Sequence, residues 1–157
     1  MDNKDKLLKY AIYYLSKYSS SKINLEFILK KKIRKLNDEK KIRFQLYKEI
    51  QPILEKLEKL KLINDHLFVE NKIQSLQYKA KSKNYIKQYL FKKGINKELI
   101  KEHISIFYEN NKNIEKENAI KFAKKRNLLE DNLDYQKRLA KMARAGFSYD
   151  LAKEILK

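Results

Sequence analysis

Glycine occurs only twice in this chain of 157 residues, at Gly94 and Gly146, and both glycines stand in the same short phrase. In Lys92–Ile100 and in Arg144–Ala152, basic residues precede the glycine, and a bulky apolar residue, a capping side chain and an acidic residue follow it. Glycine just past a helix end adopts the left-handed conformation without the steric penalty of a Cβ atom. The phrase therefore predicts a corner between two helices, and its recurrence 52 residues later predicts a repeat protein.

The residues after each glycine indicate how the corner is built. Asn96 and Ser148 stand where the next helix needs an N-cap, and Phe147 is expected to pack into its corner. Another corner is predicted at residues 62–65, where Asp65 is expected to cap the helix that follows. The structural joints predicted from the sequence are Gly94, Gly146, Phe147, Ser148 and Asp65.

The rest of the composition favours an all-α chain. With only 2 Gly and 1 Pro there is little material for hairpins, and Leu, Ile, Lys, Glu and Ala dominate. Apolar residues recur at three- and four-residue steps, as on the buried face of a helix. An irregularity is expected in the third helix just before Pro52. The pattern predicts nine helices, over about 5–18, 23–36, 42–61, 66–80, 82–93, 96–109, 115–128, 134–145 and 148–156.

The predicted helices fall into three groups of three. We therefore expect three tandem three-helix repeats, at 1–64, 65–111 and 112–157, the first of which deviates through an insertion near 37–45. Three short helices bury little surface alone, so the repeats are expected to stack on one another. The predicted fold is an elongated array of right-handed type.

The chain carries a formal net charge of +18, which is spread along its whole length. Basic residues outnumber acidic ones by 17 to 8 in the first repeat, 9 to 5 in the second and 12 to 7 in the third. Such a field favours a polyanionic partner, nucleic acid first. The alternative is that the excess charge has no partner. Because 33 of the 38 basic residues are lysine, it can also reflect compositional drift toward lysine on solvated helix faces.

Six basic clusters are the candidates for contact with such a partner. In the densest one, Lys31, Arg34 and Lys35 can share one face of a helix. Plain solubility is the alternative for every cluster, and their spacing does not rank them. The candidate residues are Lys30, Lys31, Arg34, Lys35, Lys40, Lys41, Arg43, Lys79, Lys81, Lys83, Lys92, Lys93, Lys124, Lys125, Arg126, Lys137, Arg138, Lys141 and Arg144.

The sequence contains no catalytic constellation. It has no cysteine, His66 and His103 stand alone, and two glycines cannot build a phosphate-binding loop. Acidic pairs such as Glu130 and Asp131 are expected near helix starts rather than in acid–base catalysis. We therefore expect no metal, no cofactor and no enzymatic activity. No apolar run is long enough to span a bilayer, so a cytoplasmic protein without a membrane partner is expected.

Aromatic residues are numerous, with 11 Tyr and 7 Phe, and aromatic rings can stack on nucleic-acid bases. Most of them fall on the predicted apolar helix faces, so packing in the core is the expected role. Tyr13, Tyr78 and Tyr108 are the three whose exposure would favour a role in stacking.

Four phrases occur in an order that is shared by a known family. They are Tyr14–Ser19, Leu62–Phe68, Tyr89–Ile95 and Gly146–Asp150, and the last is followed by an apolar residue. Together they resemble motifs of the RecX family of regulatory proteins, over nearly the whole chain. The first repeat departs from that pattern, because the family's Lys-Gly joint is replaced there by residues 35–39.

The resemblance implies a binding protein. Members of this family modulate the RecA recombinase, commonly by lodging in the helical groove of its filament on single-stranded DNA, where they hinder strand exchange, ATP turnover and co-protease activity. It implies a part in homologous recombination, DNA repair and the SOS response, and we expect a monomer that contacts the filament and nucleic acid. The alternatives are a general helical nucleic-acid-binding repeat without filament preference and a protein–protein adaptor.

Overall fold

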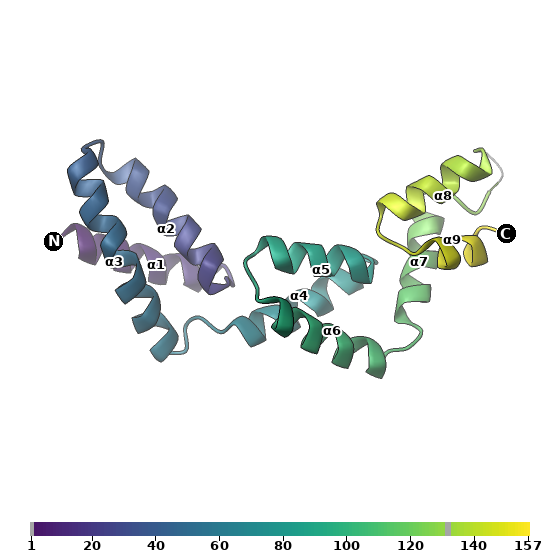
Figure 1. The fold of residues 1–157 in the computed structure, drawn as a ribbon, viewed down its shortest axis with the longest axis horizontal. Coiled ribbons are helices and arrows are strands. Elements are labelled where there is room, and N and C mark those ends of the chain that lie inside the picture. Colours follow the sequence, from purple (N-terminus) through teal and green to yellow (C-terminus); the bar gives the residue numbers. More distant parts are fainter. Residues whose placement is uncertain (1, 131–132) are drawn as a thin grey trace. The chain divides into compact units, whose positions relative to one another are not determined.

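The computed structural model describes residues 2–130 and 133–157, and this part of the chain contains nine α-helices and no strand (Figure 1). Asp131, a member of an acidic pair named above, lies outside the described residues. The all-α prediction is confirmed, and each helix end lies within three residues of its predicted position. The helices are α1 (Asn3–Lys17), α2 (Lys22–Leu36), α3 (Lys40–Lys59), α4 (Asp65–Tyr78), α5 (Lys83–Lys92), α6 (Lys97–Asn110), α7 (Ile114–Lys125), α8 (Tyr135–Arg144) and α9 (Tyr149–Ile155).

The helices belong to two compact units, each of which is described by itself. Unit 1 holds the described residues up to Phe68 together with Lys93–Ile95. Unit 2 holds Val69–Lys92 together with the described residues from Asn96 to the C-terminus. The division into three repeats at about residues 64 and 111 stays a prediction, as does the elongated, right-handed form of the array.

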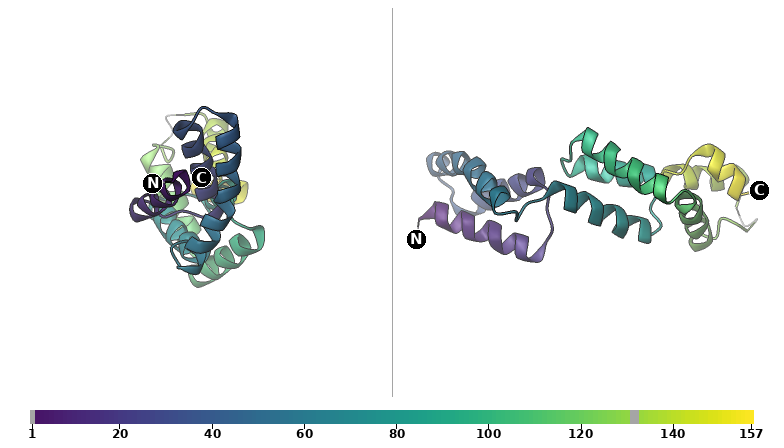
Figure 2. Two further views of the ribbon diagram at one scale, coloured as in Figure 1. Left: turned by 90° about the vertical axis from the view of Figure 1, so that its left-hand side faces the viewer. Right: turned by 90° about the horizontal axis from the view of Figure 1, so that it is seen from below.

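The core of unit 1 lies between α1, α2 and α3, which all contact one another. α1 crosses behind α2 and α3 in Figure 1 and lies along one side of them in the right-hand view of Figure 2. Each helix presents one apolar face to the other two, as its three- and four-residue periodicity requires. The buried side chains of this core are Leu7, Ala11, Leu25, Leu29, Ile33, Leu46, Ile50, Ile53, Leu54, Leu57 and Ile63.

Helix α3 continues through Pro52, so the irregularity predicted before this residue is wrong. Proline removes the amide that would donate to the carbonyl four residues earlier, here that of Lys48. Pro52 and Lys48 are both exposed, whereas Ile53 and Leu54 next to the proline are buried. Packing of the apolar face therefore holds the helix together, and the missing hydrogen bond falls among exposed residues.

The C-terminal core of unit 2 lies between α7, α8 and α9. Helix α9 packs against both of the other two, as Figure 1 shows. The Phe147 ring, 3% exposed, lies in the corner between α8 and α9, and its centroid is 5.7 Å from that of Phe122. The buried side chains of this core are Ala119, Ala123, Leu128, Leu139, Met142, Phe147, Ala152 and Leu156.

A joint in unit 1 fastens the start of α2 to segments that are distant in the sequence. The hydroxyl of Ser21 caps α2 by accepting from the Asn24 amide at 3.1 Å, and it donates to the carbonyl of Lys93. The next amide, that of Lys22, donates to Oδ1 of Asp65 at 3.0 Å. One serine and one carboxylate therefore satisfy two amides in the first turn of α2 and tie it to two other segments.

The same joint recurs in unit 2 at the start of α5. The Ser82 hydroxyl accepts from the Tyr85 amide at 3.1 Å and donates to the carbonyl of Ala145 at 2.7 Å. The Lys83 amide donates to both carboxylate oxygens of Glu115, at 2.9 and 3.2 Å. In both joints the accepting carbonyl belongs to the residue before a glycine. Each glycine motif therefore supplies the acceptor, and a serine at the start of another helix supplies the donor.

The two glycines have a left-handed backbone, with φ of +78° at Gly94 and +92° at Gly146. Each also lies against another element. A Cβ atom at Gly94 would lie 2.5 Å from Cβ and Cγ2 of Ile23, and one at Gly146 would overlap the hydroxyl of Ser82. Both positions therefore need glycine for close approach as well as for conformation.

Two of the three predicted caps, Asn96 and Ser148, cap the helix that follows them, and the third, Asp65, does not. Asn96 accepts from the Glu98 amide at the start of α6, and Ser148 accepts from the Leu151 amide at the start of α9. Asp65 was expected to cap α4, but it is the first residue of that helix and its side chain accepts from Lys22 instead. The cap of α4 is Asn64, whose Oδ1 accepts from the Leu67 amide at 3.1 Å.

Candidate nucleic-acid interface

The largest concentration of predicted contact residues lies in a hollow of unit 2, which we call the basic hollow. It encloses about 610 Å³ and is lined by 14 residues, half of which are lysine or arginine. Among the described residues that line it, none is aspartate or glutamate. The seven cations are Lys79, Lys81, Lys121, Lys125, Arg126, Lys141 and Arg144.

Helix ends place these cations around the hollow. Lys79 and Lys81 follow the C-terminus of α4, Lys125 ends α7, and Arg144 ends α8. Cations in the last turn of a helix or just beyond it are favoured by the helix dipole. Six of the seven cations therefore suit the end of their own helix, whereas Lys121 lies one turn further back on α7. The packing of these helices within unit 2 brings all seven to one surface.

Aromatic rings line the same hollow. Tyr78 at the end of α4 is 84% exposed, and Tyr85 on α5 is 40% exposed. The ammonium group of Lys81 lies over the Tyr85 ring at 4.8 Å, whereas the Tyr78 ring is open to solvent. An open ring among cations is the arrangement that proteins use to stack a base while holding the adjacent phosphates. Of the other two tyrosines singled out in the sequence, Tyr13 is exposed and Tyr108 is buried.

The hollow joins residues from three clusters that are separate in the sequence. Lys79 and Lys81 come from one cluster, Lys125 and Arg126 from a second, and Lys141 and Arg144 from a third. Lys121 was not among the predicted contact residues. It lies four positions before Lys125, so both side chains emerge from the same face of α7, and this spacing was the available signal.

Arg138 is removed from the candidates because its side chain is buried, 5% exposed. Its Nη1 donates to the carbonyl of Leu128 at 3.0 Å, and its guanidinium group lies 5.5 Å from the ring centroid of Tyr135. Leu128 follows α7, so this arginine fastens α8 to the end of α7. It does not line the hollow.

Other candidates in unit 2 lie away from the hollow. The Lys83 amide is held by Glu115, and its ammonium group lies 5.2 Å from the centre of the Tyr108 ring. Lys124 and Lys137 are exposed but do not line the hollow. Lys92, on α5, lines a different groove, which is described below.

The candidates of unit 1 lie on α2, at the start of α3 and beside Gly94. Lys30 is paired with Glu26 at 2.6 Å, and the Lys31 ammonium group lies over the Phe27 ring at 4.5 Å. Lys93 is half-buried, and its carbonyl belongs to the first joint. The remaining candidates are exposed except for Arg43, which is half-buried; they are Arg34, Lys35, Lys40, Lys41 and Arg43.

One carboxylate at the second joint has an altered acidity. Burial raises the pKa of Glu115, while the hydrogen bond from the Lys83 amide and the positive charge of Lys83 act in the opposite direction. Burial also raises the pKa of Tyr108, and the negative charge of Glu115 acts in the same direction. Glu115 accepts from the Lys83 amide at the start of α5 and is not among the residues that line the hollow, so its role is in the joint.

No group of three or more His, Cys, Asp or Glu side chains among the described residues is placed to hold a metal ion. His103 and His66 lie on different helices, and Nδ1 of His103 is 4.0 Å from a carboxylate oxygen of Glu70. Within residues 2–130 and 133–157, no helix has the length and apolar character that crossing a membrane requires.

Two curated proteins with similar sequences carry the same name. No family model matches the chain. The regulatory protein RecX of Clostridioides difficile strain 630 is 32% identical over 148 residues, which span 83% of this chain and 68% of that protein. The regulatory protein RecX of Myxococcus xanthus strain DK1622 is 26% identical over 157 residues, which span 93% of this chain and 81% of that protein.

Two solved structures with a similar fold are also of RecX proteins. The crystal structure of RecX from Lactobacillus salivarius matches with a TM-score of 0.68 at 26% identity, covering 98% of this chain and 94% of that one. Another crystal structure of a regulatory protein RecX matches with a TM-score of 0.71 at 24% identity, over 98% of this chain and 73% of that one, and it supports the fold alone.

Proposed function

The chain belongs to the RecX family of regulatory proteins, and on this premise we propose that it regulates the RecA recombinase by binding RecA filaments on single-stranded DNA. In this proposal it acts by binding and not by catalysis, as a cytoplasmic monomer. It occupies the helical groove of the filament and hinders strand exchange, ATP turnover and co-protease activity. Its biological setting is homologous recombination, DNA repair and the SOS response.

The observation that carries the proposal is the basic hollow. Six cations that the sequence scatters over three clusters gather there with Lys121, and an open tyrosine ring, that of Tyr78, lies among them. Compositional drift predicts cations that are spread evenly over solvated faces. The gathering of seven cations, with no carboxylate among the described lining residues, instead fits a surface that receives the backbone of a nucleic acid.

The strength of such a contact has a measurable signature. Each phosphate that a protein neutralises on a single strand releases condensed counterions, and log K falls with log[salt] by about 0.7 per contact. If all seven cations of the hollow contacted phosphates, the slope would approach about −5. Binding through the hollow therefore has to weaken steeply as salt is added.

The proposal is separated from its alternatives by comparing three targets. Affinity is measured for bare single-stranded DNA, for bare RecA and for the assembled filament, while ATP hydrolysis by RecA is followed. Tight binding to the filament with loss of hydrolysis supports the proposal. Equal affinity for bare DNA and filament would favour a general nucleic-acid-binding repeat, and the absence of salt-sensitive binding to any target would favour an adaptor.

A further inference from the structure

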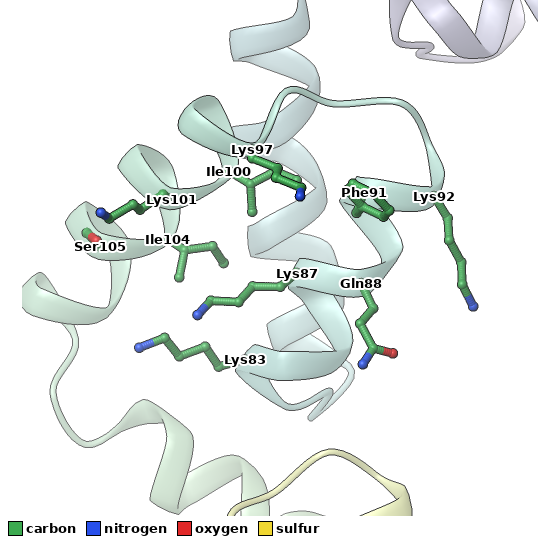
Figure 3. A pocket seen from close by; sticks show the side chains of 10 residues that line it. All are labelled: Lys83, Lys87, Gln88, Phe91, Lys92, Lys97, Ile100, Lys101, Ile104 and Ser105. Atoms are coloured by element: carbon green, nitrogen blue, oxygen red, sulfur yellow. The ribbon is translucent and has the colours of Figure 1, made fainter.

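A second concave surface of unit 2 has a different chemistry, and we call it the α5–α6 groove. It encloses about 410 Å³ between α5 and α6. Ile100 and Ile104 project from α6 toward α5, and Phe91 stands on the last turn of α5 (Figure 3). The groove shares no lining residue with the basic hollow, so substitutions can separate the two surfaces.

Lysines surround this apolar floor. In the part of the chain that the structure describes, ten residues line the groove; five are lysine and none is aspartate or glutamate. In Figure 3 the chains of Lys83 and Lys87 extend from α5 toward α6, where Lys101 lies near Ile104. Their methylene stems add apolar surface while the ammonium groups stay in water. The groove thus offers apolar contact at its centre and positive charge at its edge.

We infer that the α5–α6 groove binds an acidic protein segment that inserts one or two apolar side chains. The Phe91 side chain is 55% exposed at the edge of the groove and gives an anchor side chain something to pack against. Carboxylates on either side of the anchor would meet the lysine rim. A volume of 410 Å³ accommodates a few aliphatic or aromatic side chains.

The chemistry of the groove favours a protein segment over a nucleic acid. The Lys97 ammonium group lies 5.6 Å from the centre of the Phe91 ring, so one ring face is already covered. The rest of the floor is aliphatic, 6% exposed at Ile100 and 2% at Ile104, and offers no ring on which a base could stack. Open aromatic surface among cations is found instead in the basic hollow, at Tyr78.

The test uses synthetic peptides and the full chain. The first probe is a labelled peptide of about a dozen residues, mostly Glu and Asp, with Phe and Leu at its centre. The second probe has the same charge but Ser in place of Phe and Leu, and the third is single-stranded oligo(dT). Binding is followed by fluorescence anisotropy for the wild type and for Phe91→Ala.

A matched control is available in unit 1. Phe44 is 62% exposed, and the Lys48 ammonium group lies over its ring at 4.6 Å, so Phe44→Ala removes a ring of similar exposure that is also covered by a lysine. Both rings are on the surface, and far-UV circular dichroism checks that each variant is folded. The double variant Lys87→Gln, Lys101→Gln tests the rim.

The inference predicts that the anchored peptide binds at least about tenfold more tightly than the serine peptide. Phe91→Ala and the rim variant should each weaken the anchored peptide by about tenfold, while Phe44→Ala leaves it unchanged. Equal binding of the two peptides would overturn the inference, since charge alone would then account for it. A loss of oligo(dT) binding in Phe91→Ala as large as the loss of peptide binding would assign the groove to nucleic acid, and no binding of the anchored peptide would also overturn the inference.

Discussion

Gly146→Ala should destabilise the second joint through two separate effects. The left-handed backbone at this position, with φ of +92°, costs a residue with a Cβ atom about 1–2 kcal/mol. The new Cβ would also overlap the hydroxyl of Ser82, which donates to the Ala145 carbonyl and accepts from the Tyr85 amide. Displacing that hydroxyl weakens two hydrogen bonds worth about 1 kcal/mol each, so the total loss in unfolding free energy should be about 2–4 kcal/mol.

The two effects can be separated by a double-mutant cycle with Ser82→Ala. In that background the overlapping oxygen is absent and the two hydrogen bonds are already lost. Gly146→Ala should then cost only the backbone effect, so the two substitutions should be coupled by about 1–2 kcal/mol. The first joint provides the control. A Cβ at Gly94 would meet Ile23 and not the hydroxyl of Ser21, so Gly94→Ala and Ser21→Ala should not show this relief.

Urea unfolding followed by circular dichroism gives the free energies of the four variants of each cycle. Hydrogen exchange in the first turn of α5, at the Tyr85 amide above all, reports on the joint itself, because local opening need not involve the whole chain. Additive effects of Gly146→Ala and Ser82→Ala, to within about 0.5 kcal/mol, would refute the account of this joint. So would a coupling of the same sign and size at Gly94 and Ser21.

Three further predictions concern other features. Ala80 has a left-handed backbone with φ of +57° after α4, and Ala80→Gly should raise the urea midpoint by an amount equivalent to about 0.5–1 kcal/mol; an unchanged midpoint would contradict this reading. Because burial raises the pKa of Glu115, the folded chain keeps this proton to a higher pH than the unfolded chain, and its contribution to stability is lost as pH rises through that pKa. Glu115→Gln keeps an oxygen acceptor for α5 and should therefore flatten the pH dependence of the urea midpoint in the range just above the usual pKa of a glutamate, whereas an unchanged dependence would show that other groups control it. A third prediction concerns the cluster on α2, replaced in the triple variant Lys31→Gln, Arg34→Gln, Lys35→Gln. This variant should keep its helicity but bind the filament more weakly than the wild type at the same salt concentration. An unchanged affinity would remove the cluster from the interface.

The helices and the corners at the glycines could be predicted because they depend on local sequence. Three- and four-residue periodicity fixes a helix, and a glycine after basic residues indicates where it ends. Pro52 misled the prediction because the apolar face of α3 outweighs one missing hydrogen bond. Packing between helices kept α3 continuous through Pro52. The local rule that proline disrupts a helix takes no account of such packing.

The sequence predicted the glycine corner of each joint but not the serine and carboxylate that bind there, because these partners are distant in the sequence. Ser82 and Ala145 are 63 residues apart, and Lys83 and Glu115 are 32 residues apart. A single chain shows no sign of such pairs beyond the recurrence of Ser-Lys at Ser21 and Ser82. Asp65 was assigned to its own helix for the same reason.

The basic clusters were visible in the sequence, but their grouping was not. Helical phase could have excluded Arg138, because it lies three residues after Tyr135 and four before Met142, on the buried face of α8. It could also have added Lys121, on the face of Lys125. Which clusters meet depends on how helices pack within unit 2, and charge runs carry no information about that.

The measurement that tests the central claim most directly is the salt dependence of filament binding in two matched triple variants. One replaces three lysines of the basic hollow by glutamine, at Lys121, Lys125 and Lys141, and the other replaces three lysines outside it, at Lys9, Lys56 and Lys59. Both lose the same charge, so an effect of net charge alone is equal in the two. We predict that the negative slope of log K against log[salt] becomes shallower by about 2 in the hollow variant and hardly changes in the control. Equal slopes and equal affinities in the two variants would contradict the assignment of the basic hollow as the surface that binds the filament.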